Sequence, residues 1–441
     1  MRHYDAIIIG FGKGGKTLAV DLAKRGKKVA LIEKSNQMYG GTCINEGCIP
    51  SKSLIVQAQK TDYPSAIENK EQLILKLRQK NYDKLAQFEN IDIIDGTARF
   101  VDNYTVEINH QDKISADYLF INTGSQTIIP SIKGIQETKH IYTSASLMKE
   151  KQLPKNLAII GGGYIGLEFA SMYARYGSNV TVFEFNERLV AREDEDVALE
   201  IQHILENQGV QFQLNSQVEE LSNQKEKVVI QYRQNDVGYI DHFDAVLLAA
   251  GRRANTDDLG LENTDVKVDE RGQVIVNDNL QTDVPHIYAM GDVKGGLQFT
   301  YISLDDYRIV KNHLFENQTR TINNRGYIPY SVFISPTFSR VGLSEQEALK
   351  QGYDIKVAKI PTASIPRANV DGKPEGVLKA IIDKKTDLIL GCVLLCERSE
   401  EMINFVQLAM NQNLKYQDIA SHIFTHPSMS EALNDLFNAV Q

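Results

Sequence analysis

Residues 6–15 of the chain read AIIIGFGKGG, an apolar run that leads directly into a glycine-rich loop. The stretch LAIIGGGYIG at residues 157–166 repeats this pattern 151 residues later. Each loop is expected to lie between a strand (6–9 and 157–160) and a helical run that extends to Lys24 or Arg175. One Gly-x-Gly-x-x-Gly motif is weak evidence. Two copies with the same flanking pattern predict two dinucleotide-binding units.

Both copies have the same chemistry. The first glycine allows a tight turn, the second lets the backbone approach a pyrophosphate, and the third packs the helix against the strand. These positions are Gly10, Gly12 and Gly15 in the first copy and Gly161, Gly163 and Gly166 in the second. An acid ends the next predicted strand of each copy, Glu33 after 29–32 and Glu184 after 180–183. Each acid is placed to bind ribose hydroxyls; the alternative is a solvated acid at a strand end.

A smaller repeat supports two nucleotide sites. Residues 117–124 and 244–251 both run from an acid through apolar residues to a glycine, Gly124 or Gly251. A third turn of this kind, at 287–292, ends in Asp292. Each segment predicts a buried strand that enters a glycine turn, as expected where a sheet edge meets a bound dinucleotide.

Two cysteines follow the first nucleotide motif, in the run GGTCINEGCIPSK at 40–52. A structural disulfide between Cys43 and Cys48 would close so small a ring that it stabilises the fold by only about 2 kcal/mol. We therefore interpret the pair as a disulfide that is made and broken during turnover. The other two cysteines, Cys392 and Cys396, share one face of a predicted strand but stand too far apart to bridge. They are interpreted as buried structural residues.

Composition excludes several classes of protein. The 441 residues carry a net charge of −9 and no basic run, which argues against nucleic acid as the main partner. The first apolar stretch is too short for a signal peptide and is followed by Lys13 and Lys16. No stretch approaches the roughly 18 apolar residues of a membrane span. Four cysteines fit a reducing compartment, so a cytoplasmic location is predicted.

With these motifs the chain resembles the class I pyridine nucleotide–disulfide oxidoreductases, the flavoprotein family of lipoamide dehydrogenase, glutathione reductase and mercuric reductase. The resemblance extends from the first glycine loop to the run HPSMSE at 426–431. The run GGLQFTYISLDDYR at 295–308 is most similar to the bacterial reactive-chlorine-resistance branch, whose members are described as hypothiocyanous acid reductases.

The resemblance implies that FAD occupies the first site. Gly10, Gly12 and Gly15 would bind its pyrophosphate and Glu33 its adenosine ribose. Lys52 would lie near the flavin N5, paired with Glu168 from the nicotinamide domain; the alternative for Lys52 is a surface lysine. The remaining FAD contacts would come from the cysteine loop and from two later segments: Gly41, Thr42, Gly124, Asp292 and Thr300.

The second site would bind NADH or NADPH through residues of the second glycine loop and its neighbours: Gly161, Gly163, Gly166, Glu184 and Gly251. Glu184 favours NADH, because a carboxylate bonds a ribose 2′-hydroxyl but repels a 2′-phosphate. The next arginine is Arg188, which could swing toward a phosphate.

The family's catalytic residues can also be placed. Cys48 would be the thiol next to the flavin, and Cys43 would exchange with the substrate. His426, oriented by Glu431, would move protons at the active site of the partner subunit, which implies a homodimer. No metal site is predicted.

The predicted fold class is α/β, with two Rossmann-like domains and a C-terminal α/β dimerisation domain. The FAD domain is placed at 1–140, the NAD(P)H domain at 141–265, and a central segment completing the FAD site at 266–325. The interface domain is placed at 326–441, with strands at 377–382 and 388–396 and helices around 398–412 and 429–440.

The predicted substrate is a small oxidant, chiefly hypothiocyanous acid. Mercuric reductases carry an additional C-terminal cysteine pair, whereas this chain ends in FNAVQ, so mercury or another metal ion is a weaker alternative. Dihydrolipoamide dehydrogenase is a second alternative, disfavoured by the 295–308 run. A flavin-containing redox sensor is the alternative from another class.

Overall fold

The structure is a computed structural model that describes residues 1–58 and 60–441. It forms two compact units. The first contains Met1–Ile129, Ser144–Lys151 and Gly251–Arg325, and the second contains Pro130–Thr143, Gln152–Ala250 and Gly326–Gln441. No helix in this described part of the chain has the length and apolar content that a bilayer span requires.

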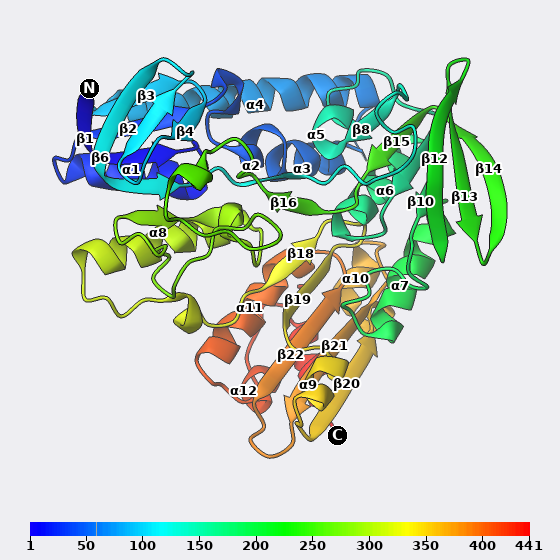
Figure 1. Cartoon of the computed structure of the whole chain (residues 1–441). Helices are drawn as coiled ribbons and strands as arrows, with labels where there is room; N and C mark the ends of the chain where they lie inside the picture. The colour runs from blue at the N-terminus through cyan, green and yellow to red at the C-terminus, as the bar shows by residue number, and fades with distance from the viewer. Residues whose placement is uncertain (59) are drawn as a thin grey trace. The chain divides into compact units, whose positions relative to one another are not determined.

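The first unit is built around a seven-stranded sheet with β17 beside β6 and the order β3-β2-β1-β6-β5-β4 (Figure 1). Five strands run parallel: β1 (Arg2–Ile9), β2 (Val29–Glu33), β3 (Ile91–Asp95), β6 (Asp112–Ile121) and β17 (Ile287–Ala289). The strand β5 (Thr105–Ile108) pairs antiparallel with β6, and β4 (Ala98–Phe100) pairs antiparallel with β5. The apolar run at 6–9 is buried on both faces, which is typical of a parallel sheet covered on both sides.

Helices α1 (Lys13–Lys24) and α8 (Thr300–Phe315) pack against each other, and their buried apolar residues share one core with β1 and β2. The cysteine run forms two short helices, α2 (Thr42–Asn45) and α3 (Cys48–Gln57), followed by the long α4 (Tyr63–Ala86). The unit also includes α5 (Ser144–Leu147) and a two-stranded ribbon of β7 (Ser125–Thr127) and β16 (Arg252–Ala254).

The second unit contains the second nucleotide motif. Its parallel sheet has the order β11-β10-β9-β15-β8. The strands are β8 (Ile141–Thr143), β9 (Asn156–Ile160), β10 (Asn179–Phe183), β11 (Gln211–Gln213) and β15 (Ala245–Leu248). Helix α6 (Tyr164–Tyr176) follows the glycine loop, and α7 (Glu195–Asn207) follows β10. A meander of β12 (Ser216–Gln224), β13 (Lys227–Gln234) and β14 (Val237–Phe243) was not predicted.

The C-terminal part of the second unit is an antiparallel sheet with the order β18-β19-β22-β21-β20. Its strands are β18 (Tyr330–Val332), β19 (Phe338–Gly342), β20 (Ile355–Pro361), β21 (Val377–Asp383) and β22 (Ile389–Leu395). The helices are α9 (Glu345–Lys350), α10 (Pro366–Val370), α11 (Ser399–Asn411), α12 (Tyr416–Ala420) and α13 (Ala432–Asn438). The predicted strands correspond to β21 and β22 and the predicted helices to α11 and α13.

A buried lysine joins this antiparallel sheet to the nucleotide-binding part of the same unit. Lys379 on β21 is only 2% exposed and donates to Asp194 and Asp196, each at 3.1 Å. Its third partner is Glu345, at 2.7 Å. Because an unpaired buried ammonium is costly, the contacts with Asp194 and Asp196 make the connection between these two parts specific.

The predicted fold class is confirmed: two parallel sheets, each with a glycine loop, and a C-terminal α/β domain. The predicted boundaries between domains stay predictions.

The third glycine of the second loop gives a test of this packing. A Cβ on Gly166 would lie 2.0 Å from the carbonyl oxygen of Gly161, so Gly166→Ala should lower the free energy of unfolding by about 1–3 kcal/mol. Gly238→Ala on β14 is the control, since its Cβ would meet no atom within 4 Å. Chemical denaturation followed by circular dichroism measures both. Equal stabilities of the two variants would contradict this packing argument.

Candidate functional site

The first glycine loop leaves the carboxyl end of β1 and enters α1. Gly10 has a φ of +104°, and a Cβ there would lie 2.4 Å from the Asn122 carbonyl oxygen. The N-cap residue of α1 is Gly12, which has no side chain of its own to accept from the first amides of the helix. Backbone N–H groups at a helix N-terminus bind phosphate groups, because the helix dipole adds a partial positive charge there. The loop therefore fits the pyrophosphate of FAD.

Glu33 ends β2 and is buried. Its Oε2 accepts a hydrogen bond from the Phe11 amide at 3.0 Å, and its Oε1 accepts one from the Ser35 amide at 3.4 Å. Burial raises the pKa of this carboxyl group, and the two amides partly offset that effect. The carboxylate is held beside the glycine loop, where a ribose hydroxyl can donate to it.

Glu184 has the same arrangement in the second unit. Its Oε2 accepts from the Gly162 amide at 2.7 Å and its Oε1 from the Asn186 amide at 2.9 Å. Gly162 and Asn186 follow Phe11 and Ser35 by the same 151 residues. Arg188 donates instead to the Ala191 carbonyl oxygen, at 3.5 Å. The second glycine loop thus has a fixed carboxylate beside it, as the first loop does.

The glycines of the second loop differ in their surroundings. Gly161 has a φ of +113°, and its Cβ would lie 2.6 Å from the Ala249 carbonyl oxygen. Gly163 is the uncapped N-terminus of α6 and has open space beside it. Gly251, which the sequence places with this site, falls in the first unit.

The cysteine loop lies directly against the first nucleotide loop. A Cβ on Gly41 would lie 2.7 Å from the Gly12 Cα, so the two backbones approach as closely as glycine permits. Gly41 is also the N-terminal cap of α2, which carries Thr42 and Cys43. The thiols are thereby placed beside the proposed FAD pyrophosphate site.

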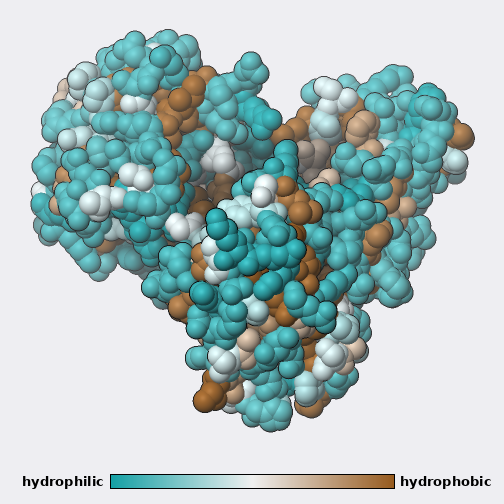
Figure 2. Space-filling model, turned by 90° about the horizontal axis from the view of Figure 1, so that it is seen from below, coloured by the Kyte–Doolittle hydropathy of each residue, from teal (hydrophilic) through white to brown (hydrophobic). Residues whose placement is uncertain are grey.

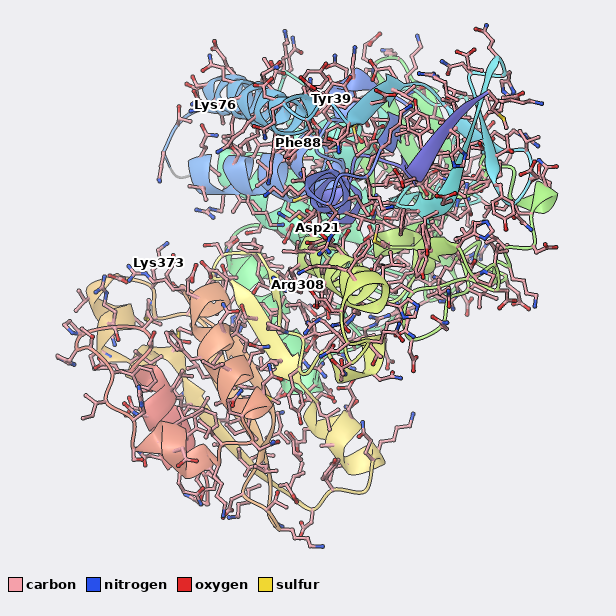
Figure 3. The ribbon with its side chains drawn as sticks, turned by 90° about the vertical axis from the view of Figure 1, so that its left-hand side faces the viewer. Asp21, Tyr39, Lys76, Phe88, Arg308 and Lys373 are labelled. Atoms are coloured by element: carbon pink, nitrogen blue, oxygen red, sulfur yellow. The ribbon has the colours of Figure 1, made fainter. Side chains whose placement is uncertain are left out.

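Aromatic side chains pack against Tyr39, the residue that directly precedes the cysteine run. Tyr39, labelled in Figure 3, lies 5.2 Å from the Phe11 ring and 5.1 Å from the Tyr82 ring, between ring centroids. Its hydroxyl donates to Asp95 at 2.7 Å. The residue before the cysteine run is thus fixed by side chains of the nucleotide loop, α4 and β3.

Cys43 and Cys48 are free thiols in this structure and lie within hydrogen-bonding distance of each other. The hydrogen bond from Cys48 lowers the pKa of Cys43 to about 6, and Thr300, Lys16 and Lys52 act in the same direction. The same interaction raises the pKa of Cys48, so the pair keeps one proton, on Cys48. Cys43 is therefore the thiolate at neutral pH, and the thiolate is the nucleophilic form.

The remaining predicted FAD residues lie in the same unit. Thr300 begins α8, and its Oγ1 is 3.9 Å from Cys48 Sγ. Asp292 accepts from the Ser125 hydroxyl at 2.7 Å. Lys52 is half-buried on α3, and Gly124 adopts a φ of +73°.

Glu168 and the histidine pair lie in the second unit. Glu168 on α6 is buried and accepts from the Phe333 amide at 2.9 Å. His426 Nδ1 is 2.8 Å from Glu431 Oε2, with the histidine side chain 71% exposed. If Nδ1 donates to this carboxylate, Nε2 faces solvent and can exchange a proton.

Several residues that hold the FAD site were missed. Arg252 donates to Ser125 through Nε at 2.9 Å and through Nη2 to its carbonyl oxygen at 2.7 Å, which fixes the partner of Asp292. Asn122 Nδ2 donates to the Gly10 carbonyl oxygen at 3.1 Å, and the Ser303 hydroxyl accepts from the Gly14 amide at 3.1 Å. Arg252 and Asn122 each lie within two residues of the repeated glycine turn, a signal that could have identified them.

Cys392 and Cys396 are both buried, as expected, and neither forms a disulfide. Burial raises the pKa of both thiols. Within residues 1–58 and 60–441, no group of three or more His, Cys, Asp or Glu side chains is placed to hold a metal ion.

Comparison with known families agrees with this geometry. Residues 4–306 match the pyridine nucleotide-disulphide oxidoreductase model, and residues 328–437 match the dimerisation domain of that family. The chain belongs to this family. It is therefore an oxidoreductase and a flavoprotein of the disulfide reductase type, and the family implies FAD and NAD(P)H as its cofactors.

Individual relatives cover most or all of the chain. The probable pyridine nucleotide-disulfide oxidoreductase RclA of Escherichia coli (strain K12) is 49% identical over 445 residues, with all of both chains covered. The Cu(II) complex of HOCl-induced flavoprotein disulfide reductase RclA from Escherichia coli superposes with a TM-score of 0.96, at 50% identity and full coverage of both chains. The mercuric reductase of Staphylococcus aureus is 32% identical, with 98% of this chain and 81% of that protein covered.

The coupled thiols predict a specific pH dependence. Below a pH of about 6, Cys43 becomes protonated, and its alkylation in the reduced protein should slow about tenfold per pH unit. Cys48→Ala removes the donor and should raise the pKa of Cys43 by about 1 or more, whereas Cys48→Ser keeps a donor and should raise it less. Iodoacetamide rates between pH 4 and 9 measure this. Identical profiles for the two variants would rule out the hydrogen bond as the cause.

Proposed function

We propose that this chain is a FAD-dependent NAD(P)H oxidoreductase that reduces a small oxidant, chiefly hypothiocyanous acid, through Cys43 and Cys48. The observation that carries the proposal is a dithiol with one thiolate, placed directly against a dinucleotide loop. A relative with full-length coverage that is described as HOCl-induced supports a role in oxidative or reactive-chlorine defence. A small electrophilic sulfur compound needs an exposed thiolate and a proton donor, and no dedicated binding pocket.

The cofactors are assigned by the donors on each loop. In this proposal the first glycine loop, Glu33, Gly41, Thr42 and Asp292 hold FAD, with Gly124, Thr300 and Lys52 nearby. FAD, when bound, passes the two electrons of the nicotinamide to the disulfide. In this proposal the second loop and Glu184 hold the nicotinamide nucleotide. NADH is favoured, because Glu184 would repel a 2′-phosphate and Arg188 is bonded elsewhere.

The two thiols divide the reaction. The Cys43 thiolate attacks the sulfur of hypothiocyanous acid, and the S–O bond breaks as hydroxide leaves. The partner subunit's His426, protonated, gives its proton to that hydroxide, which becomes water. Cys48 then attacks the Cys43 sulfur, thiocyanate leaves, and the histidine takes up the Cys48 proton. The oxidant gains two electrons and the two thiols become a disulfide.

A homodimer supplies the histidine in this scheme. The match to the family's dimerisation domain supports dimer formation. The C-terminal domain also exposes large apolar side chains: Phe405 (50%), Leu408 (59%) and Ile423 (91%). Figure 2 looks toward this domain and shows brown hydrophobic residues among the hydrophilic ones on its surface. Exposed apolar groups of this size commonly mark an interface. Glu431 would orient the imidazole.

The alternatives use the same core chemistry. Mercury reduction is disfavoured because both cysteines of the C-terminal domain, Cys392 and Cys396, are buried. Lipoamide as substrate is disfavoured by the 295–308 run, and a redox sensor would show slow turnover with every oxidant. The four cysteines fit a reducing cytoplasm, which we propose as the location.

The oxidant is tested by a substrate panel. The holoenzyme should give a higher kcat/KM with hypothiocyanous acid than with lipoamide, oxidised glutathione or Hg²⁺, measured by loss of NADH and of NADPH. A kcat/KM for lipoamide that equals or exceeds that for hypothiocyanous acid would establish a lipoamide dehydrogenase instead. Uniformly slow turnover would favour the sensor.

The proton donor is tested by His426→Ala. Flavin reduction by the nicotinamide should remain, while oxidant turnover falls on the order of 10²–10⁴-fold, as expected for a positioned proton-transfer group. His110→Ala is the matched control, because His110 is also exposed and lies 3.4 Å from a carboxylate, Glu107. Stopped-flow absorbance separates the two half-reactions. Slow flavin reduction with normal oxidant turnover would refute the role.

The origin of the histidine is tested with mixed dimers. A Cys43→Ser protomer and a His426→Ala protomer should each be inactive alone, and a verified heterodimer should regain part of the activity. Heterodimers without activity would refute a site shared between subunits.

A further inference from the structure

Lys16 lies in the first turns of α1, and its side chain bonds to the start of the cysteine run at residues 40–52. Its Nζ donates to the Gly40 carbonyl oxygen at 3.2 Å and to Asn81 Oδ1 at 2.6 Å. Asn81 is itself fixed on α4, where its Nδ2 donates to the Leu77 carbonyl oxygen at 2.7 Å. The ammonium group therefore connects three segments: α1, α4 and the start of the cysteine run.

Gly40, which Lys16 contacts, forms the corner of the chain just before α2, the helix that carries Cys43. Gly40 and Gly41 have φ values of +98° and +80°, which favour glycine. A second contact from α4 holds the other end of the turn, where Arg78 Nε donates to Asn45 Oδ1 at 2.9 Å. Asn45 in turn donates to the Gly41 carbonyl oxygen at 2.9 Å. The position of Cys43 is thus set by cations that lie on the neighbouring helices.

Lys16 also acts on Cys43 by its charge. The groups that lower the pKa of Cys43 are the Cys48 and Thr300 side chains, followed by the charges of Lys16 and Lys52. Burial opposes them. The charged groups that act on Lys16 are Cys43, Lys13 and Lys84.

The pKa of Lys16 indicates when this charge is present. Burial and the two neighbouring lysines lower it to about 8, and Cys43 raises it. Lys16 is therefore mostly charged at pH 7 and loses its charge as the pH rises through about 8. The charge is present over the whole range in which Cys43 ionises.

We propose that Lys16 is a positioning residue for the redox-active loop: its ammonium group holds the Gly40 corner and supplies a positive charge that favours the Cys43 thiolate. The proposal rests on the proposed role of Cys43 as the reactive thiol. A lysine of α1 thus takes part in the thiol chemistry, together with Lys52, whose charge also favours the Cys43 thiolate.

The test uses the FAD-loaded full-length protein in the Cys48→Ser background, so that Cys43 is the one reactive cysteine while Cys392 and Cys396 stay buried. Lys16→Met should raise the pKa of Cys43 by roughly 0.5–1, which slows iodoacetamide alkylation at pH 6 about threefold or more. Lys16→Arg keeps the charge and should keep the profile of the parent. Lys24→Met, on the exposed last turn of α1, removes the same charge and should change nothing.

The outcomes separate this inference from the proposed function. If Cys43 of the parent is not alkylated, the proposed role of Cys43 fails. If the parent reacts and Lys16→Met follows the same pH profile, only the role of Lys16 is refuted. A Lys16→Met protein that loses FAD is replaced by Lys16→Gln, which keeps a donor for Gly40 without the charge and should raise the pKa equally. A Lys16→Gln profile identical to that of the parent refutes the proposal.

Discussion

Two backbone turns approach the neighbouring strand so closely that only glycine fits, and the rest of the molecule is arranged around them. A Cβ on Gly10 would lie 2.4 Å from the Asn122 carbonyl oxygen, and one on Gly161 would lie 2.6 Å from that of Ala249. This contact directs the strand through a tight turn into its helix. It also fixes the amides that bind Glu33 and Glu184, so the phosphate and ribose positions are determined together.

A third close approach, between Gly41 and Gly12, places the two thiols beside the first glycine loop. Because Gly41 meets Gly12 without an intervening side chain, the cysteine helix begins where the pyrophosphate loop ends. The short α2 has only four residues and little stability of its own, so its position depends on contacts from α1, α4 and the aromatic residues around Tyr39. Thiol reactivity is therefore a property of the whole domain and not of the CINEGC run alone.

The motifs were predictable because backbone geometry demands particular residues at particular spacings. The two strand–loop–helix units, the acids at 33 and 184 and the paired thiols all follow from such demands. Ser303 was not predictable in this way, because it acts through a contact with Gly14, a residue more than 100 positions distant. The same applies to Lys379, which bonds the distant Asp194 and whose aliphatic strand neighbours conceal a buried ion pair.

The order of ionisation within the thiol pair also lies beyond sequence analysis. Spacing shows that two sulfurs can meet, whereas their protonation depends on which sulfur receives the hydrogen bond and which cations are near. In the structure Cys43 receives the hydrogen bond from Cys48, and the charges of Lys16 and Lys52 also lower its pKa. The thiolate is the form that attacks an electrophilic sulfur. After that attack Cys48 carries the remaining proton and must lose it to close the disulfide. The exposed His426 imidazole, whose Nδ1 lies 2.8 Å from Glu431 Oε2, is a group of the kind that can accept such a proton.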